Sequence, residues 1–191
     1  MHPRVILLKP GYLKRDQAGN ILDARSSVTL IESDRGRIIV DSGQVGDEEE
    51  ILKALKRLGL DGSDIDFLVN THSHPDHCAN NHLFARAKIL YPKDGELIST
   101  GVRAMATPGH SPDSISLVVD APAHLLDEDE MAPATRRVVI AGDALPTLGN
   151  FQKKVPPALH YDRALAVASM DRIIEIADVV IPGHDRPFLV R

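Results

Sequence analysis

The chain contains one dense run of imidazole and carboxylate side chains, T-H-S-H-P-D-H. His72 and His74 lie two positions apart, so both rings project to the same side of an extended segment. Pro75 restricts the backbone and favours the start of a short helix, which would carry Asp76 and His77. Four side chains that can bind a metal ion therefore leave the chain within a few residues of one another. A structural or surface histidine cluster is the alternative interpretation of this run alone.

Three further turns present residues of the same chemical type. The turns T-P-G-H, A-G-D and P-G-H each end a strand-like apolar segment and present His110, Asp143 and His184. Sites in open α/β sheets gather beyond the carboxyl ends of the strands, and the glycines in these turns permit a tight backbone. We therefore expect the three side chains to converge with the first run on a shared cleft.

The elements that must position these residues are short strands and two helices. Nine apolar segments predict strands: residues 5–8, 28–31, 37–40, 67–69, 88–91, 102–106, 115–119, 138–141 and 179–181. Helices are predicted over 47–60, with Gly59 as a C-cap, and over 163–177, with Asp162 as the N-cap. This order predicts an α/β layered domain with sheets inside and helices outside. The acidic, Pro/Ala-rich segment 121–136 predicts an exposed loop, either solvated or overhanging the site.

Composition restricts the classes of protein further. The 191 residues, 43% of them hydrophobic, predict one domain over residues 1–191. No segment predicts a membrane helix or a signal peptide, and the single cysteine, Cys78, excludes a disulfide framework. We therefore expect a cytoplasmic protein with no membrane partner. The net charge of −5 and the absence of tryptophan argue against a nucleic-acid surface.

In this order the four motifs resemble those of the metallo-β-lactamase fold superfamily. The resemblance includes I-I-V-D-S-G at residues 38–43 and covers about residues 28–184. It implies a four-layer αββα sandwich with a dinuclear metal site at one edge of the sheets. The stretches S-V-T-L-I-E-S-D, H-S-H-P-D-H-C-A-N-N-H-L-F and T-P-G-H-S-P-D-S are most similar to the subgroup around metallo-β-lactamase domain-containing protein 1.

Carried over residue by residue, the resemblance implies two sets of three ligands: His72, His74 and His110 for one ion, and Asp76, His77 and His184 for the other. Asp143 would bridge the two ions, and Asp41 would orient the ligand loop. Ligands of this kind suit two Zn²⁺ ions, and Fe or Mn also fit them. The resemblance further implies that the true β-lactamases carry a cysteine where this chain has Asp143, so antibiotic hydrolysis is not expected.

The expected function is metal-dependent hydrolysis of a small ester, thioester, lactone or phosphoester by a hydroxide that bridges two metal ions. Asp76 would bind metal and accept the proton of the nucleophile. No G-x-S-x-G motif competes with this chemistry, and we expect Cys78 to be a buried packing residue. The alternatives are a metal-dependent ribonuclease, an iron-dependent persulfide dioxygenase and a non-catalytic metal-binding domain.

Residues outside the ligand set are assigned weaker roles. His160 and Tyr161 are candidate proton donors or a surface pair, and Ser111 and Asp113 are candidates for hydrogen bonds that support His110. A small basic patch, Lys153, Lys154 and Arg163, would favour RNA, although such residues are more often plain solvated surface. We expect a small-molecule substrate, and a homodimer is only the base-rate expectation.

Overall fold

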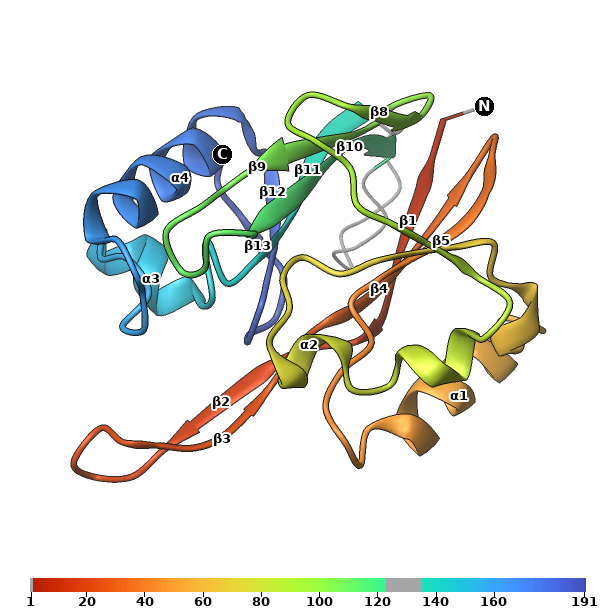
Figure 1. Cartoon of the computed structure of the whole chain (residues 1–191). Coiled ribbons are helices and arrows are strands. Elements are labelled where there is room, and N and C mark those ends of the chain that lie inside the picture. The colour runs from red at the N-terminus through yellow and green to blue at the C-terminus, as the bar shows by residue number, and fades with distance from the viewer. Residues whose placement is uncertain (1, 123–134) are drawn as a thin grey trace.

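Two large β-sheets dominate the computed structural model, which describes residues 2–122 and 135–191 (Figure 1). The first sheet has the spatial order β1 (Arg4–Lys9), β4 (Val28–Ser33), β5 (Gly36–Val40), β6 (Phe67–Val69) and β7 (Lys88–Leu90). The second has the order β13 (Phe188–Leu189), β12 (Val179–Pro182), β11 (Thr135–Gly142), β10 (Ile115–Pro122), β9 (Val102–Ala106) and β8 (Leu97–Ser99). A separate hairpin, β2 (Tyr12–Arg15) and β3 (Ile21–Arg25), extends away from both sheets (Figure 1).

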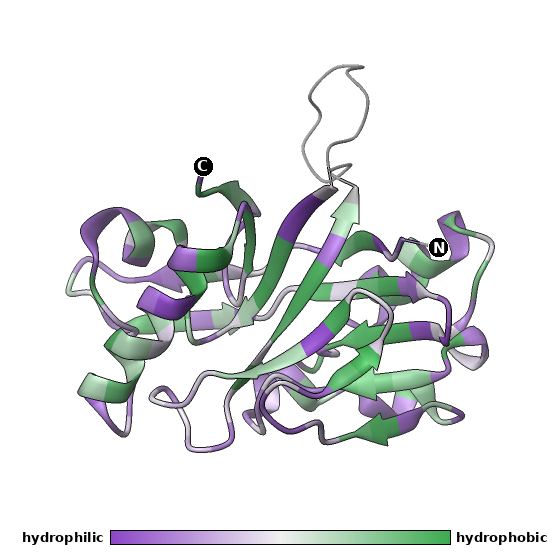
Figure 2. Ribbon diagram, turned by 90° about the horizontal axis from the view of Figure 1, so that it is seen from above, coloured by the Kyte–Doolittle hydropathy of each residue, from purple (hydrophilic) through white to green (hydrophobic). Residues whose placement is uncertain are grey.

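Strands that are apolar on both faces hold the layers together. In β5, Ile38 and Val40 point into the core between the sheets, whereas Ile39 points to the outer face. In β11, Val138 lies in the same inner core and Val139 lies on the opposite face. Since side chains alternate along a strand, such strands must be covered on both sides. Figure 2 shows hydrophobic residues along the strands of both sheets.

Helices provide the two outer layers. Helix α1 (Glu48–Arg57) packs Ile51 and Leu55 against the outer face of the first sheet. Helix α4 (Arg163–Ile176) packs Met170 and Ile173 against the outer face of the second. The remaining helical elements are short: 3₁₀-helix η1 (Gly62–Asp64), α2 (Pro75–Cys78), 3₁₀-helix η2 (Asn81–Phe84) and α3 (Leu148–Lys153). The predicted αββα sandwich is confirmed.

The nine predicted strands and both predicted helices are present with small shifts at their ends. The predicted N-cap is also present, because the Asp162 carboxylate accepts a hydrogen bond from the Leu165 amide. Sequence patterns missed β2, β3, β8 and β13, which are short or lie largely exposed at edges and therefore lack a buried apolar repeat.

The bounds of the predicted loop, residues 121–136, were wrong because they overlap the ends of two strands. Strand β10 continues to Pro122, and β11 already begins at Thr135, because the two strands remain paired from Leu117–Ile140 to Pro122–Thr135. Residues 123–134 lie outside the described part of the chain. Among the described residues, no helix has both the length and the hydrophobicity needed to cross a bilayer.

Truncation of the inner core tests this packing. Leu117 is fully buried between the sheets, so Leu117→Ala should lower the free energy of unfolding by about 2–5 kcal/mol, measured by chemical denaturation. The matched control is Leu22→Ala in the hairpin, where the side chain is 59% exposed and the expected change is within about 0.5 kcal/mol. Equal losses in the two variants would contradict the two-sheet core.

Candidate metal centre

The ends of strands from both sheets carry the predicted ligands to one place. Helix α2 begins directly after the loop that follows β6, with His74 as its N-cap. The other ligands follow β9, β11 and β12. Among the described residues the structure brings all seven predicted ligands into three overlapping groups: His72, His74 and His110; His72, His77 and Asp143; and Asp76, His77 and His184. Within each group the candidate ligand atoms lie within 4.8 Å of one another.

The Asp143 carboxylate lies at the centre of these groups. Its Oδ1 is 3.1 Å from Nε2 of His184 and 3.3 Å from Nε2 of His77. Its Oδ2 is 3.5 Å from Nε2 of His110, which belongs to the first group. A single buried carboxylate therefore contacts residues from both predicted ligand sets, and Asp76 completes the second set with its Oδ2 3.4 Å from Nε2 of His184.

In the first group, ring nitrogens face one another. Nδ1 of His74 lies 2.9 Å from Nε2 of His110, and the ring centroids of His72 and His74 are 4.6 Å apart. Rings from a strand end and from a turn in the other sheet thus direct nitrogen atoms at a common point. This is the arrangement that imidazoles adopt around a shared cation.

Hydrogen bonds to the outer nitrogens fix how the rings are turned. Nδ1 of His110 donates to the carbonyl of Leu159 at 2.7 Å, and Nδ1 of His184 donates to the carbonyl of Arg25 at 3.0 Å. Since a carbonyl can only accept, the proton must lie on Nδ1, which leaves Nε2 as the nitrogen directed at Asp143. Metal-binding histidines are usually oriented by an acceptor in this way.

Asp41 likewise orients side chains of the T-H-S-H-P-D-H run, residues 71–77. Its carboxylate accepts hydrogen bonds from the amide and hydroxyl of Thr71 and lies 2.8 Å from Nδ1 of His77. Because the Thr71 hydroxyl donates to Asp41, it accepts from Nδ1 of His72 at 3.1 Å. Asp41 itself adopts a positive φ of 58°, a conformation that aspartate tolerates better than most residues. One carboxylate thus orients two of the candidate ligands.

Three buried atoms at the centre have no hydrogen-bond partner among the described residues: Nε2 of His72, Nε2 of His77 and Oδ1 of Asp143. Buried polar atoms are rarely left unpaired, and each such atom requires an explanation. All three are atoms that a divalent cation accepts as ligands, and they lie in the same group. The residues present therefore fit metal ions.

The charges of the cluster are strongly coupled. Burial, followed by the neighbouring His77, lowers the pKa of His72 to about 2, so this ring is neutral at physiological pH. Although burial opposes it, Asp41 and Asp143 raise the pKa of His77, and Asp143 raises that of His184. Burial likewise opposes the ionised form of Asp143, but His77 and His184 hold its pKa well below the usual range. Asp143 is therefore an ionised carboxylate at the centre.

Two glycines permit the close approach of these loops. A Cβ atom at Gly183 would lie 2.1 Å from Oδ1 of Asp143, and one at Gly109 would lie 2.2 Å from the amide nitrogen of Ala166. Any side chain at either position would displace the turn that carries His184 or His110. Space therefore requires glycine at both positions, and at Gly109 the positive φ of 135° favours it as well.

The predicted support of His110 by Ser111 and Asp113 is not present, because the two ring nitrogens of His110 pair with the carbonyl of Leu159 and with His74. Ser111 donates its hydroxyl proton to Asp113 at 2.5 Å beside His110. His160 and Tyr161 are exposed, and Nδ1 of His160 donates to the carbonyl of Pro157. The prediction for Cys78 was wrong, because its side chain is half-exposed at the surface end of α2.

Sequence reasoning missed the two carbonyls that orient His110 and His184. Arg25 ends the overlooked hairpin strand β3, and Leu159 lies in the segment between α3 and α4. Every residue carries a backbone carbonyl, so no sequence signal marks these two. The turn residues Gly19 and Asn20, which separate β2 from β3, are the one sequence signal for the hairpin.

Comparison with known proteins agrees with this geometry. The family model of the metallo-beta-lactamase superfamily matches residues 23–92. A protein of Methanocaldococcus jannaschii named probable metallo-hydrolase MJ0296 is 34% identical, over 94% of this chain and 85% of its own length. The mouse protein named metallo-beta-lactamase domain-containing protein 1 is 32% identical over 88% of this chain, which spans 66% of that protein. This agrees with the predicted subgroup.

More distant matches extend over the same region. A Bacillus protein named N-acyl homoserine lactonase is 25% identical over 87% of this chain and 84% of its own length. A solved Thermotoga maritima structure of the metallo-beta-lactamase type superposes with a TM-score of 0.74 at 22% identity, covering 99% of this chain and 100% of that one. With its sequence matches, its αββα layers and its cluster of histidines and aspartates, the chain belongs to the metallo-beta-lactamase superfamily.

Proposed function

We propose that this chain is a dinuclear metal-dependent hydrolase of small esters, with lactones as the leading substrate class. The observation that carries the proposal is the position of Asp143, whose two oxygens contact His77 and His184 on one side and His110 on the other. A carboxylate shared between two ligand sets is the arrangement that holds two metal ions at one reaction centre.

The proposed ligands are those that the sequence predicts. His72, His74 and His110 would hold one ion, Asp76, His77 and His184 would hold the other, and Asp143 would be shared between them. We propose two Zn²⁺ ions, because nitrogen and carboxylate ligands without thiolate suit zinc. Bound ions of this kind supply a nucleophile from water at neutral pH and polarise the carbonyl that is attacked.

The side chains of this chain have separable tasks in the proposed reaction. Asp76 is half-buried at the mouth of the centre, where its carboxylate is placed to accept a proton from the attacking water. Asp41, together with the carbonyls of Leu159 and Arg25, keeps the histidines turned towards the centre. The proton taken by Asp76 can then pass to the leaving oxygen when the ester bond breaks.

The choice of lactones rests on the Bacillus relative, whose name assigns it to N-acyl homoserine lactones. Its similarity covers 87% of this chain and therefore includes both sheets of the sandwich. A lactone is a cyclic ester, so its hydrolysis needs the carbonyl chemistry proposed here and no further group.

The first test counts metal ions. We expect two Zn²⁺ per chain by elemental analysis after metal loading. His72→Ala should lose one ion, Asp143→Ala should disturb both, and each should reduce turnover by at least about 100-fold. His82→Ala is the matched control, since His82 is exposed and lies outside the cluster, and it should keep both ions. Full metal content and activity in Asp143→Ala would contradict the bridging role, and one Fe per chain would favour the dioxygenase.

A second test measures the protons that the chain releases when Zn²⁺ binds. In the metal-free chain, Asp41 and Asp143 raise the pKa of His77, and Asp143 raises the pKa of His184, so a cation must displace protons from these rings. We expect net proton release on Zn²⁺ binding, measured by calorimetry in buffers of different ionisation enthalpy. The apparent affinity should therefore be weaker at about pH 6 than at about pH 8. An affinity that does not change over this range would show that these rings are not displaced ligands.

A substrate panel tests the reaction itself. Proton release followed with a pH indicator should detect opening of N-acyl homoserine lactones and of simple lactones by the metal-loaded chain. An Asp143→Ala sample should lack this activity. An unstructured oligoribonucleotide, analysed on a gel, tests the ribonuclease alternative. Cleavage of RNA without any ester or lactone hydrolysis would overturn the proposed function.

A further inference from the structure

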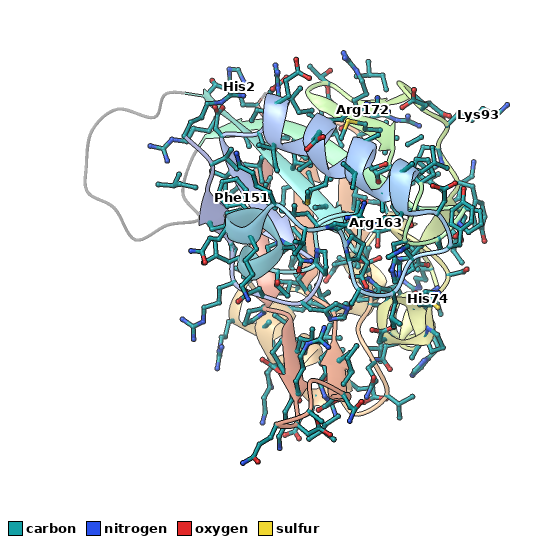
Figure 3. All side chains as sticks on the ribbon, turned by 90° about the vertical axis from the view of Figure 1, so that its left-hand side faces the viewer. His2, His74, Lys93, Phe151, Arg163 and Arg172 are labelled. Carbon is teal, nitrogen blue, oxygen red and sulfur yellow. The ribbon has the colours of Figure 1, made fainter. Side chains whose placement is uncertain are left out.

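A groove of about 480 Å³ lies beside the proposed metal centre, between the β2–β3 hairpin and the residues around α3. Leu13 and Arg15 line it from the hairpin, Lys153 and Val155 line it from the other wall, and His184 lies on its surface. Figure 3 shows this side of the molecule, with Phe151 of α3 above the hairpin and His74 to the right. The groove therefore has a proposed metal ligand as part of its lining.

Both walls of the groove are connected to the centre by hydrogen bonds. The hairpin ends at Arg25, whose carbonyl accepts the Nδ1 proton of His184. The opposite wall continues from α3 to Leu159, whose carbonyl accepts the Nδ1 proton of His110. A molecule in the groove would therefore lie between the two segments that orient these histidines, next to the place where the ester bond would be cleaved.

The charge of the groove differs from that of the chain as a whole. Each wall supplies one cation, Arg15 or Lys153, although the net charge of the chain is −5. Within the described part of the chain, neither cation has a carboxylate within 4 Å. Asp185 also lines the groove, but its two oxygens accept hydrogen bonds from the amides of Leu148 and Arg186. Nη1 of Arg15 donates to the carbonyl of Gly19 at 2.7 Å, so the remaining guanidinium N–H groups of Arg15 and the ammonium of Lys153 are available to an anion.

We infer that this groove selects substrates that carry a carboxylate or phosphate at a distance from the ester bond, with Arg15 and Lys153 binding that anion. Leu13 and Val155 supply apolar surface for the carbon chain between the two groups. The inference rests on the proposed function and narrows it to anionic small esters and lactones. Arg15 and Lys153 are then specificity-determining residues, because charge-assisted hydrogen bonds to an anion are stronger than neutral ones.

The test compares two esters with the same leaving group, p-nitrophenyl hydrogen glutarate, which carries a free carboxylate, and p-nitrophenyl pentanoate, which does not. The measured quantity is the ratio of kcat/KM for the anionic ester to that for the neutral ester. We expect a ratio above one that falls about tenfold in Arg15→Ala and in Lys153→Ala, and further in Lys153→Glu. Added salt should lower the ratio of the wild-type chain. Lys56→Ala, on the exposed face of α1, is the matched control and should keep the wild-type ratio.

Binding of glutarate, measured by calorimetry on the metal-loaded chain, separates this inference from the proposed function. If neither ester is hydrolysed, the proposed function fails, and weaker glutarate binding in Arg15→Ala and Lys153→Ala than in Lys56→Ala still supports the groove. If both esters are hydrolysed with one ratio in all variants, the groove assignment is overturned and the hydrolase stands. Preferential cleavage of an oligoribonucleotide that is lost in the two groove variants would overturn the small-molecule assignment.

Discussion

The ionised carboxylate of Asp143 is buried where strands of both sheets end, and the rest of the centre is arranged around it. Removing such a charge from water costs several kcal/mol unless cationic or hydrogen-bonding partners replace the solvent. Here the partners are His77, His184 and His110, all within 3.5 Å of its oxygens. A centre with a buried central carboxylate, a second carboxylate from Asp76 and several imidazoles is suited to divalent cations, which would pair with the carboxylates and the unpaired ring nitrogens together.

Two backbone carbonyls and one carboxylate outside the proposed ligand set fix how three of the histidine rings are turned. The carbonyls of Arg25 and Leu159 hold the Nδ1 protons of two histidines, and Asp41 lies against the Nδ1 atom of a third. These acceptors come from a hairpin, from the segment before α4 and from the end of β5. The geometry of the centre therefore depends on how distant parts of the sandwich pack, and a change far from the ligands can alter it.

The same contacts connect the centre to the proposed groove. The hairpin and the residues around α3 each orient a histidine and each form one wall. Arg15 and Lys153 give the groove a positive character that the acidic chain does not have elsewhere on average. In the function proposed here, these two segments would set substrate choice, and the strand ends would set the reaction type.

The sequence by itself determined the layers and the donor atoms. Two-sided apolar strands such as β5 and β11 require cover on both faces, and the H-x-H-x-D-H run places its ligands by local geometry. Because these signals are local, nine strands, two helices and the convergence of all seven candidate ligands could be predicted. Only the tertiary structure decided that the carbonyls of Arg25 and Leu159 orient the histidines, and that Arg15 and Lys153 share a groove. Such contacts join residues far apart in the chain, and a carbonyl or a surface cation has no local pattern that marks its partner.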